Sequence, residues 1–321
     1  MKISEQKNKT SLAGVLLLVL TALIWGTSFI SQSEGSKLVE PFTFNGIRTL
    51  LGAIVLVPVI LIRDKKLKSK LSVQEVEQKK VSDKKTLIYG SLLGIALCLA
   101  TNFQQFAFVD PNHSAGKIAF ITAMYMFIVP ILGFFFGKKV PLSTWICVLI
   151  AIIGLYFLCI DERGLGSITV SDILALICAL FFSVQILLIE KYAPECDGIK
   201  LSCVQFFSSG IISCILMFIF ETPKFSGIKA AAFPIMYSGI MSCGVAYTLQ
   251  IAGQKYCEAT IASMIMCLES VFAALSEAAF GALFMIGGKV LSFREWIGCA
   301  IMFSAIILSQ VLQNKKTAET K

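Results

Sequence analysis

The chain has 321 residues, of which 56% are hydrophobic and 15% are charged, and its formal net charge is +8. Its mean hydropathy is +0.81, whereas a soluble domain is about half apolar and about a quarter charged. This composition excludes a soluble enzyme, a disordered chain and a small disulfide-stabilised secreted module. It predicts an all-α polytopic membrane protein.

Apolar residues gather in ten blocks, and a membrane-crossing helix needs about 20 such residues. We therefore predict ten transmembrane helices. In chain order they span residues 12–32, 41–62, 86–107, 115–136, 141–160, 169–189, 200–220, 234–255, 260–287 and 292–312. The first block lacks a convincing signal-cleavage site, so we expect a retained helix there. The ninth is long and contains two glutamates, which favours a kink or a tilt.

The placement of lysine and arginine predicts the orientation of these helices. With both termini in the cytoplasm, the cytoplasmic segments hold 20 basic residues and the outer loops hold 6. This bias favours a multi-pass protein of the cell membrane with cytoplasmic tails at residues 1–11 and 313–321. The predicted loop 63–85 carries nine basic residues, so it either binds anionic lipids or is an ordinary cytoplasmic loop. The charge lacks interleaved aromatic residues, so no nucleic-acid partner is expected.

The two halves of the sequence resemble each other at offsets near 150 residues. The matched positions include Gly137-Lys138 with Gly288-Lys289, Trp145-Ile146 with Trp296-Ile297, and Asn102 with Gln250. They predict two five-helix repeats, 12–160 and 161–312. Because five is odd, the second repeat enters the bilayer from the opposite side. Such inverted repeats are typical of secondary transporters, which bind substrate between the halves and work by alternating access.

Four segments carry a resemblance to a known family. They are Ala22 to Phe29, Arg48, Ser114 to Pro130, and Leu268 to Leu275. Through them the sequence resembles the ten-helix EamA-type branch of the drug/metabolite transporter superfamily over nearly the whole chain. The resemblance implies export, amino-acid-like substrates, and a cavity surrounded by predicted helices one, three, four, six, eight and nine. Similar proteins often carry Gly-Glu where this chain has Gly-Lys, at Lys138 and Lys289, so no role of those glutamates is carried over.

Polar side chains within the apolar blocks are candidates for a solute cavity. Asn102 and Gln105 share one face of the third predicted helix, and Tyr247 and Gln250 share one face of the eighth. Since Asn102 and Gln250 are repeat partners, we expect the two faces to meet around a small polar solute. The alternative is hydrogen bonding that only holds helices together. The full set of candidates is Trp25, Ser28, Asn102, Gln105, Tyr125, Gln185, Tyr247 and Gln250.

Four ionisable residues lie within the predicted helices, namely Arg48, Lys117, Glu269 and Glu277. Charges in a bilayer are costly unless they are paired or hydrated, so each is a candidate for ion coupling or for an ion pair. Glu269 is the first candidate for proton coupling or for binding a substrate amine. The alternative is a salt bridge from Glu269 to Arg48 or Lys117.

The sequence favours a secondary active transporter of a small polar metabolite, with a proton gradient as one driving force. The alternatives are a lipid-linked, nucleotide-sugar or drug transporter of the same fold, or a non-transporting membrane scaffold. The sequence contains neither H-E-x-x-H nor G-x-S-x-G and has one histidine, so we expect no enzyme and no metal site. No cofactor is expected, and whether the protein is a monomer or a homodimer stays open.

Overall fold

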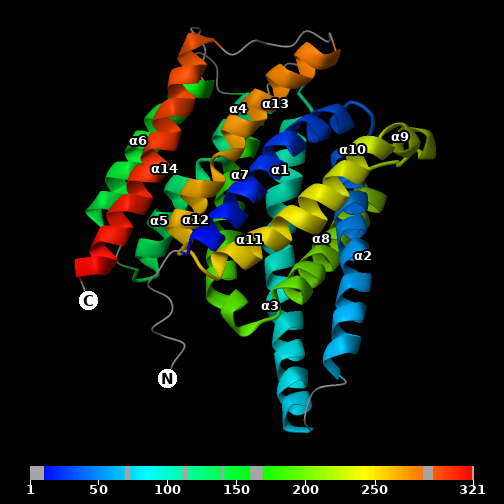
Figure 1. Ribbon diagram of the computed structural model, residues 1–321. Coiled ribbons are helices and arrows are strands. Elements are labelled where there is room, and N and C mark those ends of the chain that lie inside the picture. The colour runs from blue at the N-terminus through cyan, green and yellow to red at the C-terminus, as the bar shows by residue number, and fades with distance from the viewer. Residues whose placement is uncertain are drawn as a thin grey trace.

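A computed structural model describes residues 11–68, 73–110, 115–138, 141–159, 169–284 and 292–319, and every regular element in these ranges is helical (Figure 1). In chain order the first half contains α1 (Leu12–Ser36), α2 (Pro41–Lys68), α3 (Val73–Ala107), α4 (Ala115–Thr122), α5 (Tyr125–Phe135) and α6 (Leu142–Cys159). The second half contains α7 (Val170–Tyr192), the 3₁₀ turn η2 (Ala193–Glu195), α8 (Gly198–Phe220), α9 (Phe225–Ala230), α10 (Ala232–Tyr237), the π-helix η3 (Ser238–Ala246), α11 (Tyr247–Gln254), α12 (Ala259–Met266), α13 (Glu269–Phe284) and α14 (Phe293–Glu319).

Eight helical segments within the described ranges are long and apolar enough to cross a membrane. They are Leu12–Ser36, Pro41–Leu67, Val81–Ala107, Ala115–Phe135, Val170–Glu195, Gly198–Phe220, Ala232–Gln254 and Ala259–Ala279. Two shorter apolar helices, Leu142–Gly154 and Trp296–Leu308, coincide with the fifth and tenth predicted blocks.

Capping residues mark where several helices begin. The Ser11 hydroxyl accepts from the Gly14 N–H at the start of α1. Thr169 and Asp172 form a reciprocal capping box at the start of α7. Asp197 accepts from two backbone N–H groups at the start of α8. These side chains satisfy donors that have no partner inside a helix, so they set the first residue of each helix.

The predicted loop 63–85 is mostly helical, which corrects the sequence-based prediction. Helix α2 continues to Lys68 and α3 begins at Val73, so only residues 69–72 lie outside the described part. Lysine, glutamate and glutamine favour helices as strongly as many apolar residues do. The ends of α2 and α3 consequently extend past the neighbouring helices at the lower edge of Figure 1.

Three of the apolar segments are interrupted inside the bundle. The predicted ninth helix breaks at Cys267–Leu268, between α12 and α13, so the expected kink is confirmed. The predicted fourth helix breaks at Ala123–Met124, between α4 and α5, and the predicted eighth contains the π-helix η3. Irregular turns of this kind leave backbone groups free for other partners and are frequent at functional sites.

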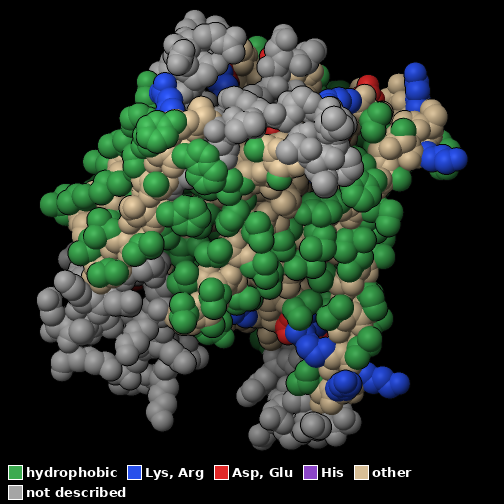
Figure 2. Space-filling model, turned by 45° about the horizontal axis from the view of Figure 1, so that its top comes forward, with side chains coloured by type: hydrophobic (Ala, Val, Ile, Leu, Met, Phe, Trp, Pro, Cys, Tyr) green, Lys and Arg blue, Asp and Glu red, His purple; other side chains and the backbone are tan. Residues whose placement is uncertain are grey.

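The bundle has an apolar exterior and a polar interior. Figure 2 shows hydrophobic side chains across the middle of the visible face, with lysine and arginine side chains towards two opposite ends. Phe218 is 74% exposed and Leu61 is 63% exposed, whereas Gln185 and Gln205 are fully buried. This distribution suits a surface in contact with lipid, where polar side chains face inward.

Close packing between α1 and α13 depends on Gly26. A Cβ atom at this position would lie 2.8 Å from the backbone nitrogen of Ala273 and 2.5 Å from Phe272 Cβ. Only glycine therefore permits this approach. Helices α2 and α8 pack together, α3 packs against α7 and α8, and α6 packs with α14 at one edge of Figure 1.

Candidate functional site

A cavity lies inside the bundle, between helices from both halves of the chain. About 400 Å³ of space in this region is free of protein atoms, and part of that space is open to solvent. Its lining combines aromatic, amide and charged side chains from α1, α2, α3, α5, α7, η3, α11 and α13. The lining residues are Trp25, Ser28, Phe29, Gln32, Arg48, Gln104, Tyr125, Phe182, Ile186, Ser242, Tyr247, Gln250 and Glu269.

Local helix geometry explains why these side chains converge. Trp25, Ser28, Phe29 and Gln32 follow the spacing i, i+3, i+4, i+7 and so share one face of α1. Tyr125 and Glu269 are the first residues of α5 and α13, directly after the two breaks, and Ser242 lies within the π-helix. Three irregular stretches of backbone thus each direct a polar side chain into the cavity.

Arg48 and Glu269 are the two charged residues of the lining, and each is 3% exposed. Arg48 Nε donates to Asn45 Oδ1 at 2.7 Å, and the guanidinium carbon lies 5.2 Å from the centre of the Phe44 ring. Within the described residues neither Arg48 nor Glu269 forms an ion pair. The predicted alternative, a salt bridge from Glu269 to Arg48 or Lys117, is therefore wrong, because Lys117 instead pairs with Asp172 at 2.8 Å.

Four buried polar atoms of the lining have no hydrogen-bond partner within the described part of the chain. They are Trp25 Nε1, Gln32 Oε1, Tyr125 Oη and Glu269 Oε1. Burial of a polar atom without a partner costs free energy, and native interiors satisfy nearly all such atoms. Donors and acceptors that remain free around one cavity are therefore available to water or to a bound polar molecule.

An aromatic surface borders these polar atoms. The Trp25 ring lies 4.6 Å from the Tyr247 ring and 6.5 Å from the Phe182 ring, measured between centroids. Beside it, Gln185 and Gln250 exchange side-chain hydrogen bonds of 3.2 and 3.4 Å. The cavity can therefore contact an apolar group on one side and hydrogen-bond a polar group on the other.

The structure brings seven of the predicted site residues together around this cavity. They are Trp25, Ser28, Arg48, Tyr125, Tyr247, Gln250 and Glu269. Sequence reasoning missed Phe29, Gln32, Gln104, Phe182, Ile186 and Ser242. The helical spacing from Trp25 could have found Phe29 and Gln32, whereas the spacing from Asn102 favoured Gln105 over its neighbour Gln104.

Five predicted residues lie elsewhere. Gln105 donates to the backbone oxygen of Gln32 at 3.1 Å, and Gln185 supports Gln250 from behind the lining. Lys117 is held by Asp172, and Glu277 is exposed on α13. Asn102 bonds to Asn45 and Ser213. The expectation that Asn102 and Gln250 face each other across one cavity is therefore corrected, because Gln250 lines the cavity and Asn102 lies between α2, α3 and α8.

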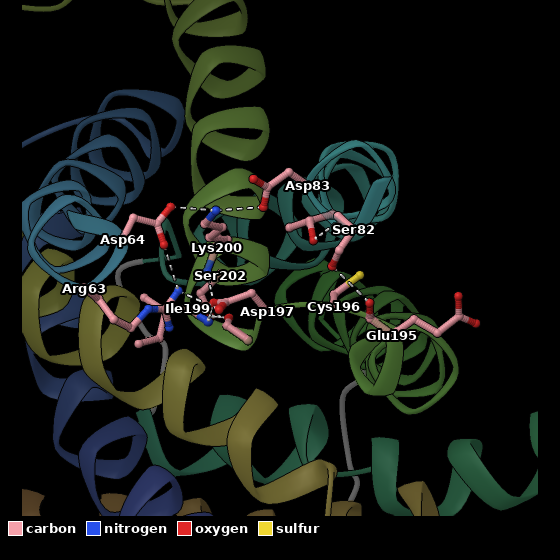
Figure 3. A network of polar contacts seen from close by, with 12 residues as sticks. Arg63, Asp64, Ser82, Asp83, Glu195, Cys196, Asp197, Ile199, Lys200 and Ser202 are labelled. Carbon is pink, nitrogen blue, oxygen red and sulfur yellow. Dashed lines mark hydrogen bonds and ion pairs between the residues drawn. The ribbon is translucent and has the colours of Figure 1, made fainter. Parts of the chain in front are cut away.

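A second polar region lies where α2 ends and α8 begins (Figure 3). Arg63 pairs with Asp197 at 2.5 Å, and Lys200 pairs with Asp64 at 2.9 Å and with Asp83 at 2.7 Å. Asp197 also caps α8, accepting from two N–H groups at 3.1 Å. These five residues, which we name the helix-end network, connect α2, α3 and α8 through opposite charges.

Neighbouring pairs extend the same end of the bundle. Lys85 of α3 pairs with Glu195 at 2.7 Å, and Lys255 Nζ donates to the Cys196 backbone oxygen at 2.9 Å. Burial lowers the pKa of the Lys255 amine, while the nearby Asp197 carboxylate acts in the opposite direction. The contact between Lys85 and Glu195 places segments 63–85 and 191–200 at one end of the molecule.

Glu221 connects α2 and α8 at their other ends. Its carboxylate accepts from the backbone N–H groups of Phe42 and Thr43 and from the Thr43 hydroxyl, each at 2.7 Å. These N–H groups belong to the first turn of α2, where a negative charge is favourable. Acidic side chains therefore connect α2 and α8 at both ends of the helix pair.

The two Gly-Lys positions that depart from the Gly-Glu pattern differ in the structure, because only the first lies in the described residues. Gly137 has φ +78°, a left-handed conformation that ends the α5 segment, and Lys138 pairs with Glu190. Gly288 and Lys289 lie outside the described residues, as does His113, the single histidine of the sequence.

Comparison with known proteins places this architecture in a family. A model of the EamA-like transporter family matches the chain twice, at residues 12–160 and 169–310. The chain belongs to the EamA-like transporter family. This membership confirms the resemblance found in the sequence, and with the apolar helices it makes the protein a multi-pass membrane transporter.

Individual curated relatives are similar over much of their length. An uncharacterized transporter of Archaeoglobus fulgidus is 28% identical over 315 residues, covering 96% of this chain and 91% of the relative. An uncharacterized transporter of Clostridium kluyveri is 25% identical over 219 residues, covering 65% of this chain and 66% of the relative. A solved crystal structure with 16% identity has a TM-score of 0.70 over 95% of this chain and 99% of that chain. That structure supports the fold alone.

Proposed function

We propose that the protein is a secondary active transporter that exports a small zwitterionic, amino-acid-like metabolite across the cell membrane. One observation carries this proposal: Arg48 and Glu269 line the same buried cavity, yet neither forms an ion pair in the described residues. Burying two opposite charges apart from each other costs free energy. A ligand that carries both a carboxylate and an ammonium group would offset this cost for both residues at once.

The lining supports a specific pose for such a ligand. The carboxylate would bind the guanidinium of Arg48, which suits planar anions, and the ammonium would bind Glu269. The rings of Trp25 and Tyr247 would contact an apolar side chain. Arg48 is the one cation of the described lining, so a substrate with several phosphates fits this cavity poorly.

Alternating access between two inverted five-helix repeats is the mechanism we propose. Two findings support it. The family model matches two successive halves of the chain, and contacts recur between them: α3 packs on α7 and α8, while η3 packs on α1 and α2. The contact between segments 63–85 and 191–200 is expected if both lie on the cytoplasmic side. The resemblance supports export, and the excess of basic residues supports cytoplasmic termini.

Glu269 is the proposed coupling residue. A carboxylate in a low-dielectric site without a cation is stabilised when it binds either a proton or a substrate amine. If the two compete for Glu269, proton binding from one side would release the amine, and a proton gradient would drive net transport. The second proposed contact is between the mostly helical segment 63–85, which carries nine basic residues, and the head groups of anionic lipids.

The test is flux in proteoliposomes that contain the purified protein. Each standard amino acid is supplied in labelled form, with and without a pH gradient across the vesicle membrane. We expect flux of at least one amino acid, stimulated by the gradient and lost in Glu269→Gln. Glu277→Gln is the matched control, because Glu277 is an exposed acidic residue of the same helix, and it should transport normally. Absence of flux for every amino acid under either gradient would overturn the proposal.

A further inference from the structure

Arg48 is the end of a hydrogen-bonded chain of side chains that runs away from the cavity. Its Nε donates to Asn45 Oδ1 at 2.7 Å. Asn45 Nδ2 donates to Asn102 Oδ1 at 3.0 Å, and Asn102 Nδ2 donates to Ser213 Oγ at 2.9 Å. All four residues are at most 6% exposed. The chain therefore connects the arginine of α2 to α3 and α8 through the interior of the bundle.

The donors and acceptors in this hydrogen-bonded series fix the orientation of the side-chain amides of Asn45 and Asn102. A side-chain amide has two N–H donors and one acceptor oxygen. Asn45 directs Nδ2 to Asn102 Oδ1 and also to the backbone oxygen of Thr101, at 2.9 Å. Asn102 directs Nδ2 to Ser213 and to the backbone oxygen of Cys98, at 2.8 Å. Since the donors of Asn45 meet two acceptors on α3, its oxygen is left to accept from Arg48.

This arrangement determines which part of the guanidinium remains free. Arg48 uses Nε for Asn45, and its planar group lies against the Phe44 ring at 5.2 Å. Among the described residues the two terminal nitrogens form no hydrogen bond, and Arg48 borders the cavity. A carboxylate needs two parallel N–H groups in a defined plane, so the plane of the guanidinium decides whether a ligand carboxylate binds well.

We infer that Asn45, held in turn by Asn102, is a positioning residue that makes the cavity selective for ligands bearing a carboxylate. This inference rests on the proposed function, since it explains how that cavity recognises one end of a zwitterion. It assigns Asn102 a role different from the cavity lining that its sequence position predicted. Asn45 itself lies outside the lining and acts through Arg48 alone.

The experiment measures ligand selectivity in the full-length protein. In a Trp145→Phe/Trp296→Phe background, Trp25 is the remaining tryptophan, and its fluorescence reports ligands entering the cavity. The probes are each standard amino acid and, for the one that binds best, its carboxamide, which keeps the amine and lacks the carboxylate. The readout is the ratio of the two dissociation constants, because a general loss of stability would weaken both probes alike.

We expect Asn45→Ala to weaken amino-acid binding about tenfold or more and to change carboxamide binding less than about twofold. Asn102→Ala should change the ratio in the same direction by a smaller factor, since it loosens Asn45 without removing the acceptor. Thr49→Val is the matched control. Thr49 is buried one turn further along α2 and bonds only to backbone oxygens of Asn45 and Gly46, so the ratio should stay unchanged.

Arg48→Ala provides the decisive comparison. Because Asn45 acts through Arg48, adding Asn45→Ala to Arg48→Ala should leave the ratio where Arg48→Ala alone puts it. An additional change of the ratio in the double variant, or an equal loss of both probes in Asn45→Ala, would overturn the inference. If the unmodified protein binds no amino acid, the proposed function fails. If it binds an amino acid with selectivity that Asn45→Ala leaves intact, only the positioning role fails.

Discussion

The cavity and the helix-end network differ in whether their charged side chains form ion pairs with other described residues. In the helix-end network Lys200 contacts two carboxylates and Arg63 a third. In the cavity Arg48 and Glu269 are more deeply buried, yet each lacks an ionic partner among the described residues. Ion pairs formed within a chain stabilise its fold, whereas charges kept apart stay available to a ligand. The comparison separates residues that hold the bundle together from residues that serve its function.

Arg48→Ala should give the largest functional effect. Removing one partner of a buried charge pair costs about 2 to 5 kcal/mol of binding free energy, so we expect transport of the preferred amino acid to fall about 100-fold. Arg48 has no ionic partner in the described chain, so its removal relieves a buried charge and offsets the loss of its hydrogen bond to Asn45. The melting temperature should therefore change little. Flux in proteoliposomes and thermal unfolding in detergent measure the two properties. A large loss of stability with normal flux would contradict the comparison, because it would make Arg48 a structural residue.

Lys200→Met should have the opposite profile. The Lys200 side chain is 14% exposed and contacts Asp64 and Asp83, so its removal leaves two carboxylates together in a partly buried site. We expect the free energy of unfolding to fall by about 1 to 3 kcal/mol. Adding Asp64→Asn should restore part of this loss, because it removes one of the repelling charges.

Lys85→Met is the comparison for that variant. Its pair with Glu195 is about half exposed on both sides, and exposed pairs contribute little. We expect no measurable change in thermal unfolding. A loss of thermal stability equal to that of Lys200→Met would show that burial does not determine how much these two ion pairs contribute.

Glu221→Ala tests the hydrogen bonds that connect α8 to the first turn of α2. It removes the acceptor for two N–H groups of the first turn of α2, and loss of such a cap costs about 0.5 to 2 kcal/mol. Glu40→Ala is the control, since Glu40 accepts one exposed bond of 3.3 Å from Thr222. In chemical or thermal unfolding, Glu221→Ala should lose more stability than Glu40→Ala.

Trp25→Phe should give the smallest of these effects. It keeps an aromatic ring against Tyr247 but removes Nε1, a buried donor without a partner in the described residues. We expect amino-acid transport to weaken about threefold, as for one neutral hydrogen bond, with stability unchanged or slightly raised. Flux that stays at the original level would show that Nε1 does not contact the substrate.

Hydropathy predicted the positions of the helices well, because burial in lipid requires long apolar runs. It could not predict where the helices end. Helix α2 continues through charged residues to Lys68, and the segment that was predicted as one helix at 115–136 divides at Ala123–Met124. Helix continuation depends on local hydrogen bonding and on neighbouring helices, neither of which hydropathy measures.

Residue type also predicted which side chains were unusual, but not what they face. Gln104 and Gln105 are adjacent and chemically identical, yet Gln104 lines the cavity while Gln105 bonds to α1. Asn102 was a reasonable candidate by its polarity, and the structure instead places it between three helices. The direction of a polar side chain follows from the rotation of its helix against several neighbours.

The amino-acid sequence alone determined the membrane class, the approximate helix positions, the internal repetition and the family, because each is encoded in local composition or in matching residues. Only the tertiary structure decided that Arg48 and Glu269 share one cavity without pairing, and that Asn45 connects Arg48 to α3. These relations join residues from distant parts of the chain. Their distances depend on how helices cross and where they break, and no periodicity within a single helix specifies that geometry.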